Sequence, residues 1–318
     1  MNESSKIYIP GHNGLLGNAL IKRLKEKGYK NLITKDREEL DLTDRNSVDS
    51  FFNSNKPEIV IIAAGKTGGI IANKTYPADF LSQNIGIQNN LFEMAIKHNV
   101  SKVVFYGSSC VYPKLSLQPI KEEYLFNGYI EETSDAYASA KIAGIIGCKA
   151  YNVQYPNAKF ICLIPNSMYG PFDNFDLNNS HVLSALIRKI HDAKINNSKE
   201  IILWGSGNPK REFVFSEDVA EASIFAIQNS DKIKNTHYNV GSSVDISIKE
   251  LANLISKIIG YPGEIQWDTS KPDGTLQKLL DSSKFLELGW RPITSLENGI
   301  KATYDWFKNT GVWGQSSR

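Results

Sequence analysis

The sequence is poor in cysteine, in long apolar runs and in excess charge, and each shortage excludes a class of protein. Its 318 residues contain three widely spaced cysteines, so neither a disulfide framework nor a zinc site is expected. A net charge of +2 provides no basic field for nucleic acid. No apolar run approaches the roughly 20 residues that span a bilayer, and the N-terminal segment lacks a signal peptide's apolar core. We therefore expect a cytoplasmic globular protein that holds no metal and contacts neither nucleic acid nor membrane.

The first half of the chain alternates short apolar runs with amphipathic segments. The apolar runs predict strands at 6–10, 31–35, 58–64, 102–106 and 159–164. The amphipathic segments predict helices such as 15–28 and 80–99. This alternation is typical of an α/β fold, here a Rossmann-type doubly wound parallel sheet with helices on both faces.

The regular alternation fades after the fifth predicted strand. Residues 165–180 are rich in Gly, Pro and Asn, which predicts a long irregular substrate loop. We expect residues 1–165 to form a dinucleotide-binding domain. Residues 166–318 would mainly form a smaller C-terminal substrate-binding domain, with some segments returning to the first sheet.

A glycine-rich turn follows the first predicted strand, in "IYIPGHNGLLGNAL". Gly11, Gly14 and Gly17 are spaced so that backbone N–H groups could approach a pyrophosphate at the start of a helix. An ordinary glycine-rich turn would show the same spacing. The strand–turn–helix context favours dinucleotide binding.

The end of the second predicted strand bears on which dinucleotide is bound. Asp36 lies about 20 residues past the glycines, where an acid accepts from a ribose 2′-hydroxyl and favours NAD. Lys35 and Arg37 flank it, and either could hold the 2′-phosphate of NADP. A solvated turn would explain all three residues equally well, so these residues leave the choice open.

Two segments carry candidate acid–base groups. In "DAYASAKIAG", Tyr137 and Lys141 are four residues apart, on one face of a helix. We expect the lysine to lower the pKa of the phenol, which would protonate a carbonyl oxygen as hydride arrives. The turn "GSSCVYPK" would add Ser108 or Ser109. A surface Tyr–Lys pair is the alternative.

These motifs together resemble the extended short-chain dehydrogenase/reductase superfamily, and within it the GDP-L-fucose synthase family. The resemblance covers nearly the whole chain, and "SSC" distinguishes it from related epimerases and dehydratases. Its other carriers are "AGKTGGIIANKTYPADF", "YASAKIAG", "NSMYGPFDNF", "NSHV", "WGSGNPKREF" and "KPDGTLQKLLD". The resemblance implies NADP as cofactor, with NAD possible, a GDP-linked 4-keto sugar as substrate, and a homodimer.

The resemblance also implies a set of functional residues. Ser108, Tyr137 and Lys141 match the family's reductase residues, while Cys110 and His181 match the pair that moves protons at C3 and C5 of the sugar. The substrate would be held by His181 together with Asn166, Val182, Trp204, Arg211 and Lys278. The cofactor would be held by Gly11, Asn13, Gly14, Leu15, Gly17, Asp36, Arg37, Ala63, Ala64, Tyr137, Lys141, Pro165 and Met168.

Three positions depart from the family pattern. Asn13 stands where the family usually has an arginine that helps to hold the NADP phosphate, and Asp36 adds a negative charge nearby. Both weaken the expected preference for NADPH without removing it, since Arg37 still matches the family. Gln277 replaces another arginine, which puts one phosphate contact in doubt.

The residue types suit this chemistry. A 4-keto group acidifies the protons at C3 and C5, and inverting such a centre needs a base on one face and an acid on the other. Cys110 would remove the proton and His181 would return one. Each has a plainer alternative, since buried cysteines are usually core residues and His181 could simply neighbour a helix N-cap. Trp204 could likewise only pack.

Competing interpretations remain at this level. A relative that only reduces C4, acting on a related GDP-4-keto sugar such as a heptose, would carry the same motifs. A non-catalytic dinucleotide-sensing protein is an alternative of another class. For assembly, the helical segments 79–98 and 136–155 carry apolar stripes that predict a four-helix dimer interface, unless the stripes only face the sheet.

Overall fold

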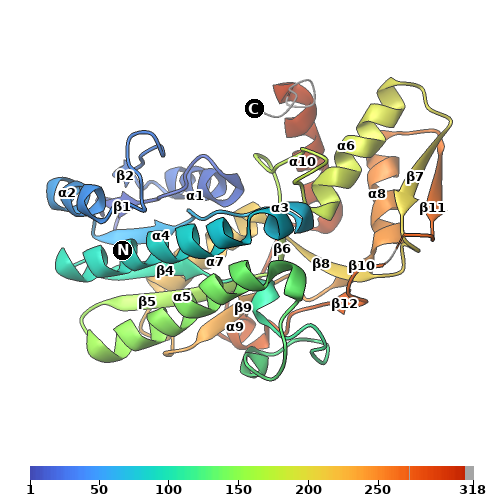
Figure 1. Ribbon diagram of the computed structural model, residues 1–318. Coiled ribbons are helices and arrows are strands. Elements are labelled where there is room, and N and C mark those ends of the chain that lie inside the picture. The colour runs from blue at the N-terminus through green and yellow to red at the C-terminus, as the bar shows by residue number, and fades with distance from the viewer. Residues whose placement is uncertain (272, 312–318) are drawn as a thin grey trace.

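The computed structural model describes residues 1–271 and 273–311, and its larger lobe is built on a parallel sheet (Figure 1). Every neighbouring pair in this sheet is parallel. In spatial order its strands are β2 (Leu32–Ile33), β1 (Ile7–Tyr8), β3 (Ile59–Ile62), β4 (Lys102–Tyr106), β5 (Lys159–Pro165) and β9 (His237–Val240). The strand order reverses between β1 and β3, and ligands of such sheets bind at the carboxyl ends of the strands beside that reversal.

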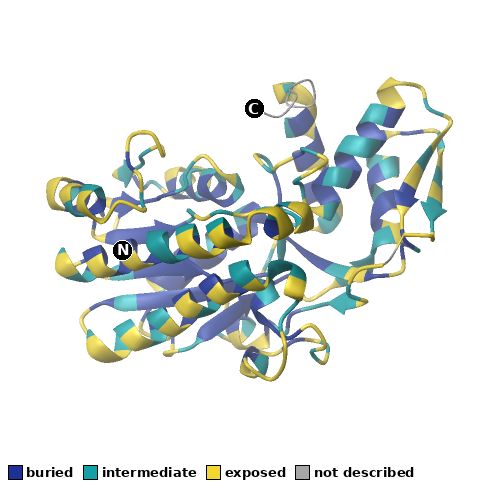
Figure 2. Cartoon of the chain, viewed as in Figure 1, coloured by how far each residue is buried: buried dark blue, intermediate teal, exposed yellow. Residues whose placement is uncertain are grey.

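Both faces of this sheet are covered by helices, because its strands are apolar on both sides. Alternate residues of β4 point to opposite faces, so that Val104 and Tyr106 enter one core while Val103 and Phe105 enter the other. Figure 2 shows the buried strands beneath helices with exposed outer faces. One face is covered by α1 (Leu15–Glu26), α7 (Ser216–Gln228) and α9 (Ser283–Glu287), and the other by α2 (Arg45–Asn55), α4 (Pro77–Lys97) and α5 (Asp135–Gln154). The predicted Rossmann-type α/β fold is confirmed.

A smaller lobe has its own apolar core. Its strands are β6 (Ser167–Tyr169), β8 (Lys210–Phe215), β10 (Asp245–Ser247) and β12 (Gln277–Lys278), with β7 (Glu200–Trp204) and β11 (Glu264–Asp268) as a separate pair. Its helices are α6 (Val182–Ile195), α8 (Ile248–Ile259) and α10 (Leu296–Thr310). Short elements between the lobes are α3 (Ile70–Thr75) and the 3₁₀ turns η1 (Ser109–Val111), η2 (Glu122–Tyr124) and η3 (Glu132–Ser134).

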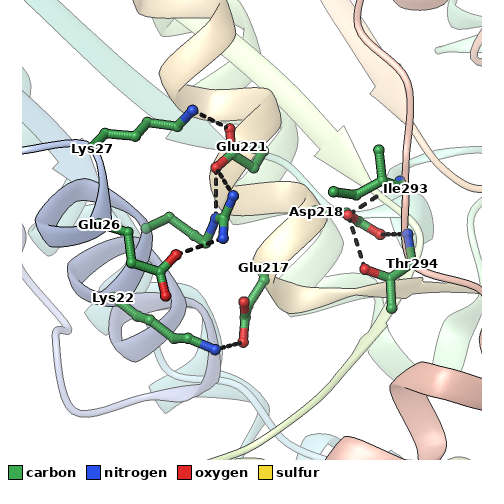
Figure 3. Close-up of polar contacts among 9 residues, drawn as sticks. Lys22, Glu26, Lys27, Glu217, Asp218, Glu221, Ile293 and Thr294 are labelled. Atoms are coloured by element: carbon green, nitrogen blue, oxygen red, sulfur yellow. Dashed lines mark hydrogen bonds and ion pairs between the residues drawn. The ribbon is translucent and has the colours of Figure 1, made fainter.

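The chain passes between the lobes more than once. After β5 it enters the smaller lobe, and it returns to the large sheet through α7 and β9 before leaving again. Asp218 of α7 fixes one crossing, because its buried carboxylate accepts from the backbone N–H groups of Ile293 and Thr294, just before α10 (Figure 3). On the outer side of α7, Glu217 and Glu221 form ion pairs with three basic residues of α1 and the turn that follows it: Lys22, Arg23 and Lys27.

The structure corrects the sequence-based boundaries in one important place. Residues 165–180 are not irregular throughout, because Ser167–Tyr169 pairs in parallel with residues 213–215 of β8. This pairing partner is more than 40 residues away, so local composition gave no sign of it. In the described part of the chain, no helix combines the length and apolar character needed to cross a bilayer.

The close approach of α5 to the sheet gives a stability test at Gly144. A Cβ added there would overlap Phe105 Cζ and lie 2.8 Å from Gln88 Oε1 of α4. Gly144→Ala should therefore lower the free energy of unfolding by about 1–3 kcal/mol, measured by urea denaturation. Gly86→Ala on α4 is the matched control, since its nearest neighbour would be 3.8 Å away. Equal effects of the two substitutions would contradict this packing.

Candidate active site

Helix α5 brings a tyrosine and a lysine to the carboxyl end of β4. Lys141 is only 7% exposed, and its Nζ donates to the backbone oxygen of Tyr106 at 3.0 Å. The same ammonium lies 4.9 Å from the centre of the Phe105 ring and 5.8 Å from that of Tyr137. Burial lowers the pKa of Lys141 to about 8. The lysine is thus a buried cation held by the last residues of a core strand.

The turn after β4 places a serine and a cysteine beside this pair. Ser108 caps η1, and its Oγ accepts from the Cys110 thiol at 3.2 Å. A hydrogen bond also joins Ser108 to the phenol of Tyr137. Of the two candidate serines, Ser108 is therefore the one that contacts Cys110 and Tyr137, whereas Ser109 is buried within the turn. The structure thus brings together four predicted residues: Ser108, Cys110, Tyr137 and Lys141.

The expectation that Lys141 lowers the pKa of Tyr137 is wrong for this structure. Burial raises the pKa of the phenol well above its ordinary value, the nearby Cys110 raises it further, and the hydrogen bond with Ser108 opposes them. The ammonium of Lys141 is directed to the Tyr106 carbonyl instead. Tyr137 therefore keeps its proton at neutral pH, which is the form that a general acid needs.

The Cys110 thiol lies near two lysines, Lys278 and Lys141. Burial raises its pKa, while the ammonium groups of Lys278 and Lys141 and the Ser108 hydrogen bond lower it. Lys278 comes from β12 in the other lobe, where its backbone pairs with Arg211 of β8. The two lobes therefore meet at this thiol, and the two cations offset only part of the rise in its pKa that burial causes.

The glycine turn forms a cradle against the end of β3. Gly11 has φ +82°, and a Cβ added there would lie 2.5 Å from the Ala64 nitrogen and 2.6 Å from the Ala63 carbonyl carbon. A Cβ at Gly17 would overlap the Gly11 carbonyl. Gly14 caps α1, and Leu15 is its first residue. Only glycine allows these backbones to approach so closely.

The end of β2 carries a polar network around Asp36. Its carboxylate accepts from Asn13 Nδ2 and lies 3.3 Å from His12 Nε2. Lys35 is paired with Glu39 at 2.6 Å, so its charge is neutralised locally. Of the two cations weighed for a 2′-phosphate, Arg37 is the exposed one. Sequence reasoning missed His12, although it lies within the glycine turn.

Other predicted residues lie along the junction of the lobes. Pro165 ends β5, and the Nδ2 of Asn166 lies 3.5 Å from the backbone oxygen of Lys278. Met168 of β6 packs against the core that α1 and α7 cover. Arg211 is half-buried on β8 next to Lys278, and burial lowers its pKa. Asn166, Arg211 and Lys278 are thus neighbours across three strands.

Trp204 lies farther out, at the end of β7, and is 69% exposed. The Nζ atoms of Lys189 and Lys271 are each 5.8 Å from its ring centre. An exposed indole between two ammonium groups suits a planar, anionic ligand. Sequence reasoning missed both lysines, although Lys189 lies two helical turns past Val182 on α6 and so faces the same way.

His181 is not part of the cluster on β4 and α5. It occupies the N-cap position of α6 and is exposed. Burial raises the pKa of the nearby Asp173 carboxyl, and His181 is among the groups that oppose this rise. No hydrogen bond within the described residues joins it to Cys110 or Tyr137. The preceding segment does reach the first lobe, where the Asn179 oxygen accepts from the Gly69 N–H at 3.2 Å.

Comparison with known proteins gives consistent matches. The model of the NAD dependent epimerase/dehydratase family matches residues 7–241. GDP-L-fucose synthase 1 of Arabidopsis thaliana is 47% identical over 306 residues, covering 96% of this chain and 94% of that protein. Two solved structures from Campylobacter jejuni are also similar. A GDP-6-OMe-4-keto-L-xylo-heptose reductase has a TM-score of 0.92 and 40% identity, covering 98% of this chain and 99% of its own. A GDP-mannoheptose C4 reductase with NADP bound has a TM-score of 0.90 and 41% identity, covering 97% and 99%.

The buried lysine gives a test by pH. Between about pH 8 and its ordinary pKa near 10.5, the unfolded chain holds the Lys141 proton that the folded protein has released. Stability should therefore rise with pH across this window, by up to about 3 kcal/mol. In Lys141→Met, the rise in the free energy of unfolding with pH should be smaller by that amount. Urea denaturation of both proteins at several pH values measures this difference. Parallel curves for the two proteins would contradict the burial of the charge.

Proposed function

The chain belongs to the NAD-dependent epimerase/dehydratase family, and from this premise we propose a two-step activity on a GDP-4-keto-6-deoxy-hexose. It inverts C3 and C5 and then reduces C4, giving GDP-L-fucose or a close relative. The observation that supports this best is the group at the end of β4. A thiol hydrogen-bonded to Ser108 lies beside a protonated Tyr137 and a buried Lys141.

The cofactor is NADP, and the glycine cradle fits a dinucleotide. Gly11 and Gly17 leave room for backbone to approach a pyrophosphate at the start of α1, with Gly14, Leu15, Ala63 and Ala64 around it. Asn13, Asp36 and Arg37 would lie at the adenosine ribose, and Pro165 and Met168 near the nicotinamide. When bound, the reduced nicotinamide supplies the hydride for C4.

Epimerisation uses groups from both lobes. Cys110 acts as the base that removes the proton beside the ketone, and the ammonium groups of Lys278 and Lys141 offset part of the rise in its pKa that burial causes. The negative charge moves onto the ketone oxygen, where Ser108 and Tyr137 donate hydrogen bonds. His181, which comes from α6, returns a proton to the opposite face of the ring. The same steps serve C3 and C5.

Reduction uses the same oxygen site. As hydride reaches C4, Tyr137 gives its proton to the developing alkoxide, and Ser108 holds the oxygen in place. Lys141 lies one helical turn away and would hydrogen-bond the nicotinamide ribose. The raised pKa of the phenol ensures that the proton is present at neutral pH.

The nucleotide part of the substrate would lie across the smaller lobe. Arg211 and Lys278 bind the diphosphate, with Asn166 and Val182 beside them, and Trp204 stacks on the base. The relative from Arabidopsis thaliana and both Campylobacter jejuni enzymes are named for GDP sugars, which supports this choice of nucleotide.

Separate variants test the two steps. Tyr137→Phe keeps the ring but removes the proton donor, so kcat for C4 reduction should fall by about 10²–10⁴-fold. Cys110→Ala should retain reduction but yield a product without inversion at C3 and C5. NMR of the product from GDP-4-keto-6-deoxy-mannose and NADPH identifies both outcomes. Full activity in Tyr137→Phe would refute the proposed acid.

A C4 reductase that does not epimerise is the second candidate, because both similar solved structures are named as reductases of GDP heptoses. Turnover in deuterated water separates the two. Epimerisation by Cys110 and His181 exchanges solvent deuterium into C3 and C5, which mass spectrometry detects. A reduced product without deuterium at these carbons would leave only the reductase.

We also infer that two copies pair through α4 and α5, in the cytoplasm. Ile146 and Val153 are 41% and 76% exposed on α5, and Leu81 is 37% exposed on α4. Apolar side chains on neighbouring helices favour a four-helix interface between copies. The three cysteines are free, which suits a reducing compartment.

Light scattering tests the assembly. The wild-type protein should have the mass of a dimer at micromolar concentration, and Ile146→Glu should give a monomer because it buries a charge in the interface. Ile195→Glu is the matched control, since Ile195 is 49% exposed on α6, away from this surface. A monomeric wild-type protein would contradict the inference.

A further inference from the structure

A buried carboxylate lies at the junction of the two lobes, outside the chemistry described above. Glu212 of β8 is 0% exposed, and no ion pair neutralises it among the described residues. Leaving a charge buried without a cation is costly unless hydrogen bonds replace its water. The surroundings of this side chain should therefore show what it holds.

The carboxylate accepts hydrogen bonds from three separate segments. Its Oε2 accepts from the side-chain Nδ2 of Asn166 and from the backbone N–H of Leu280 at 2.9 Å. Its Oε1 accepts from the backbone N–H of Ser243 at 2.7 Å. Gly241 leaves the space that the carboxylate occupies, since a Cβ there would overlap it. Burial raises the pKa of Glu212, and these hydrogen bonds oppose that rise.

These segments come from both lobes. Asn166 directly follows β5, and Ser243 follows β9, so both extend the carboxyl edge of the large sheet. Leu280 follows β12, and Glu212 itself belongs to β8. One carboxylate thus ties the edge of the cofactor-binding sheet to the two strands of the smaller lobe that meet it.

Those two strands also carry the cations assigned to the diphosphate. Arg211 precedes Glu212 on β8 and points to the opposite face of the strand, and Lys278 is two residues before Leu280. Their backbones pair with each other. The hydrogen bond between Glu212 and the Leu280 N–H therefore holds β8 and β12 together, and these are the strands that carry Arg211 and Lys278.

We propose that Glu212 is a positioning residue for the GDP site, holding Arg211 and Lys278 in register with the carboxyl ends of β5 and β9. This inference rests on the proposed function, because it concerns the nucleotide of that substrate. Three donors converge on the two carboxylate oxygens. Glutamine, which has a single acceptor oxygen, would turn its amide toward at least one of them. The three donors therefore require a carboxylate at this position, and a side chain of the same shape does not replace it.

The matched control is Asp218, a second buried carboxylate that accepts from backbone N–H groups. It is 3% exposed, belongs to α7 and accepts from Ile293 and Thr294 (Figure 3), whereas Arg211 and Lys278 belong to β8 and β12. Asp218→Asn and Glu212→Gln make the same chemical change in two places. If a loss of GDP affinity came only from a less stable protein, both variants should show it.

The test is calorimetric binding of GDP and, separately, of NADPH to wild-type protein, E212Q and D218N, with the melting temperature of each. E212Q should weaken GDP binding by about ten-fold, the value of one charge-assisted hydrogen bond, with NADPH affinity changed by less than about two-fold. D218N should lower the melting temperature and leave both affinities unchanged. If E212Q does not fold, E212D, which keeps the charge on a shorter side chain, should show the same selective loss of GDP affinity.

The outcomes separate the positioning role of Glu212 from the proposed function. E212Q that binds GDP as tightly as the wild type would overturn the positioning role. So would equal losses of GDP and NADPH affinity, since they would indicate a structural role alone. Wild-type protein that binds NADPH but not GDP would instead refute the proposed function.

Discussion

The site depends on one buried cation. The Lys141 ammonium is held by the Tyr106 carbonyl above the Phe105 ring, at the end of a strand that is buried from Val103 onward. This fixes α5 against β4 and thereby sets Tyr137 one helical turn away, beside the Ser108–Cys110 turn. Burying an ammonium is costly, which explains its lowered pKa. The same burial keeps the proton on the phenol until a substrate oxygen can accept it.

The second lobe adds the remaining groups from a different direction. Lys278 reaches the neighbourhood of Cys110 from β12, while His181 lies at the N-cap of α6. A thiol and an imidazole carried by different lobes suit the proposed epimerisation, which needs a base and an acid on the two faces of a sugar ring. The position of these groups relative to the cofactor edge then depends on the contacts between lobes, among which the Glu212 carboxylate is central.

The fold, and the grouping of Tyr137 and Lys141 beside the Ser108–Cys110 turn, could be predicted from the sequence because both depend on local patterns. Apolar runs gave the strands of the parallel sheet, and the spacing of Tyr137 and Lys141 gave a shared helical face. What failed depends on long-range contacts. The pairing of Ser167–Tyr169 with β8 could not be seen from composition. The raised pKa of Tyr137 follows from burial, and the lysine turns to a backbone carbonyl that no spacing rule identifies. The role of Glu212 likewise needs three donors from distant segments.

The most direct measurement is a crystal structure with NADP and GDP-L-fucose bound. The account predicts that Tyr137 Oη and Ser108 Oγ both lie within about 3 Å of the sugar O4. The nicotinamide C4 would face the sugar C4, and Cys110 and His181 would lie on opposite faces of the ring. A sugar bound away from the end of β4, with Tyr137 and Lys141 contacting neither ligand, would contradict it.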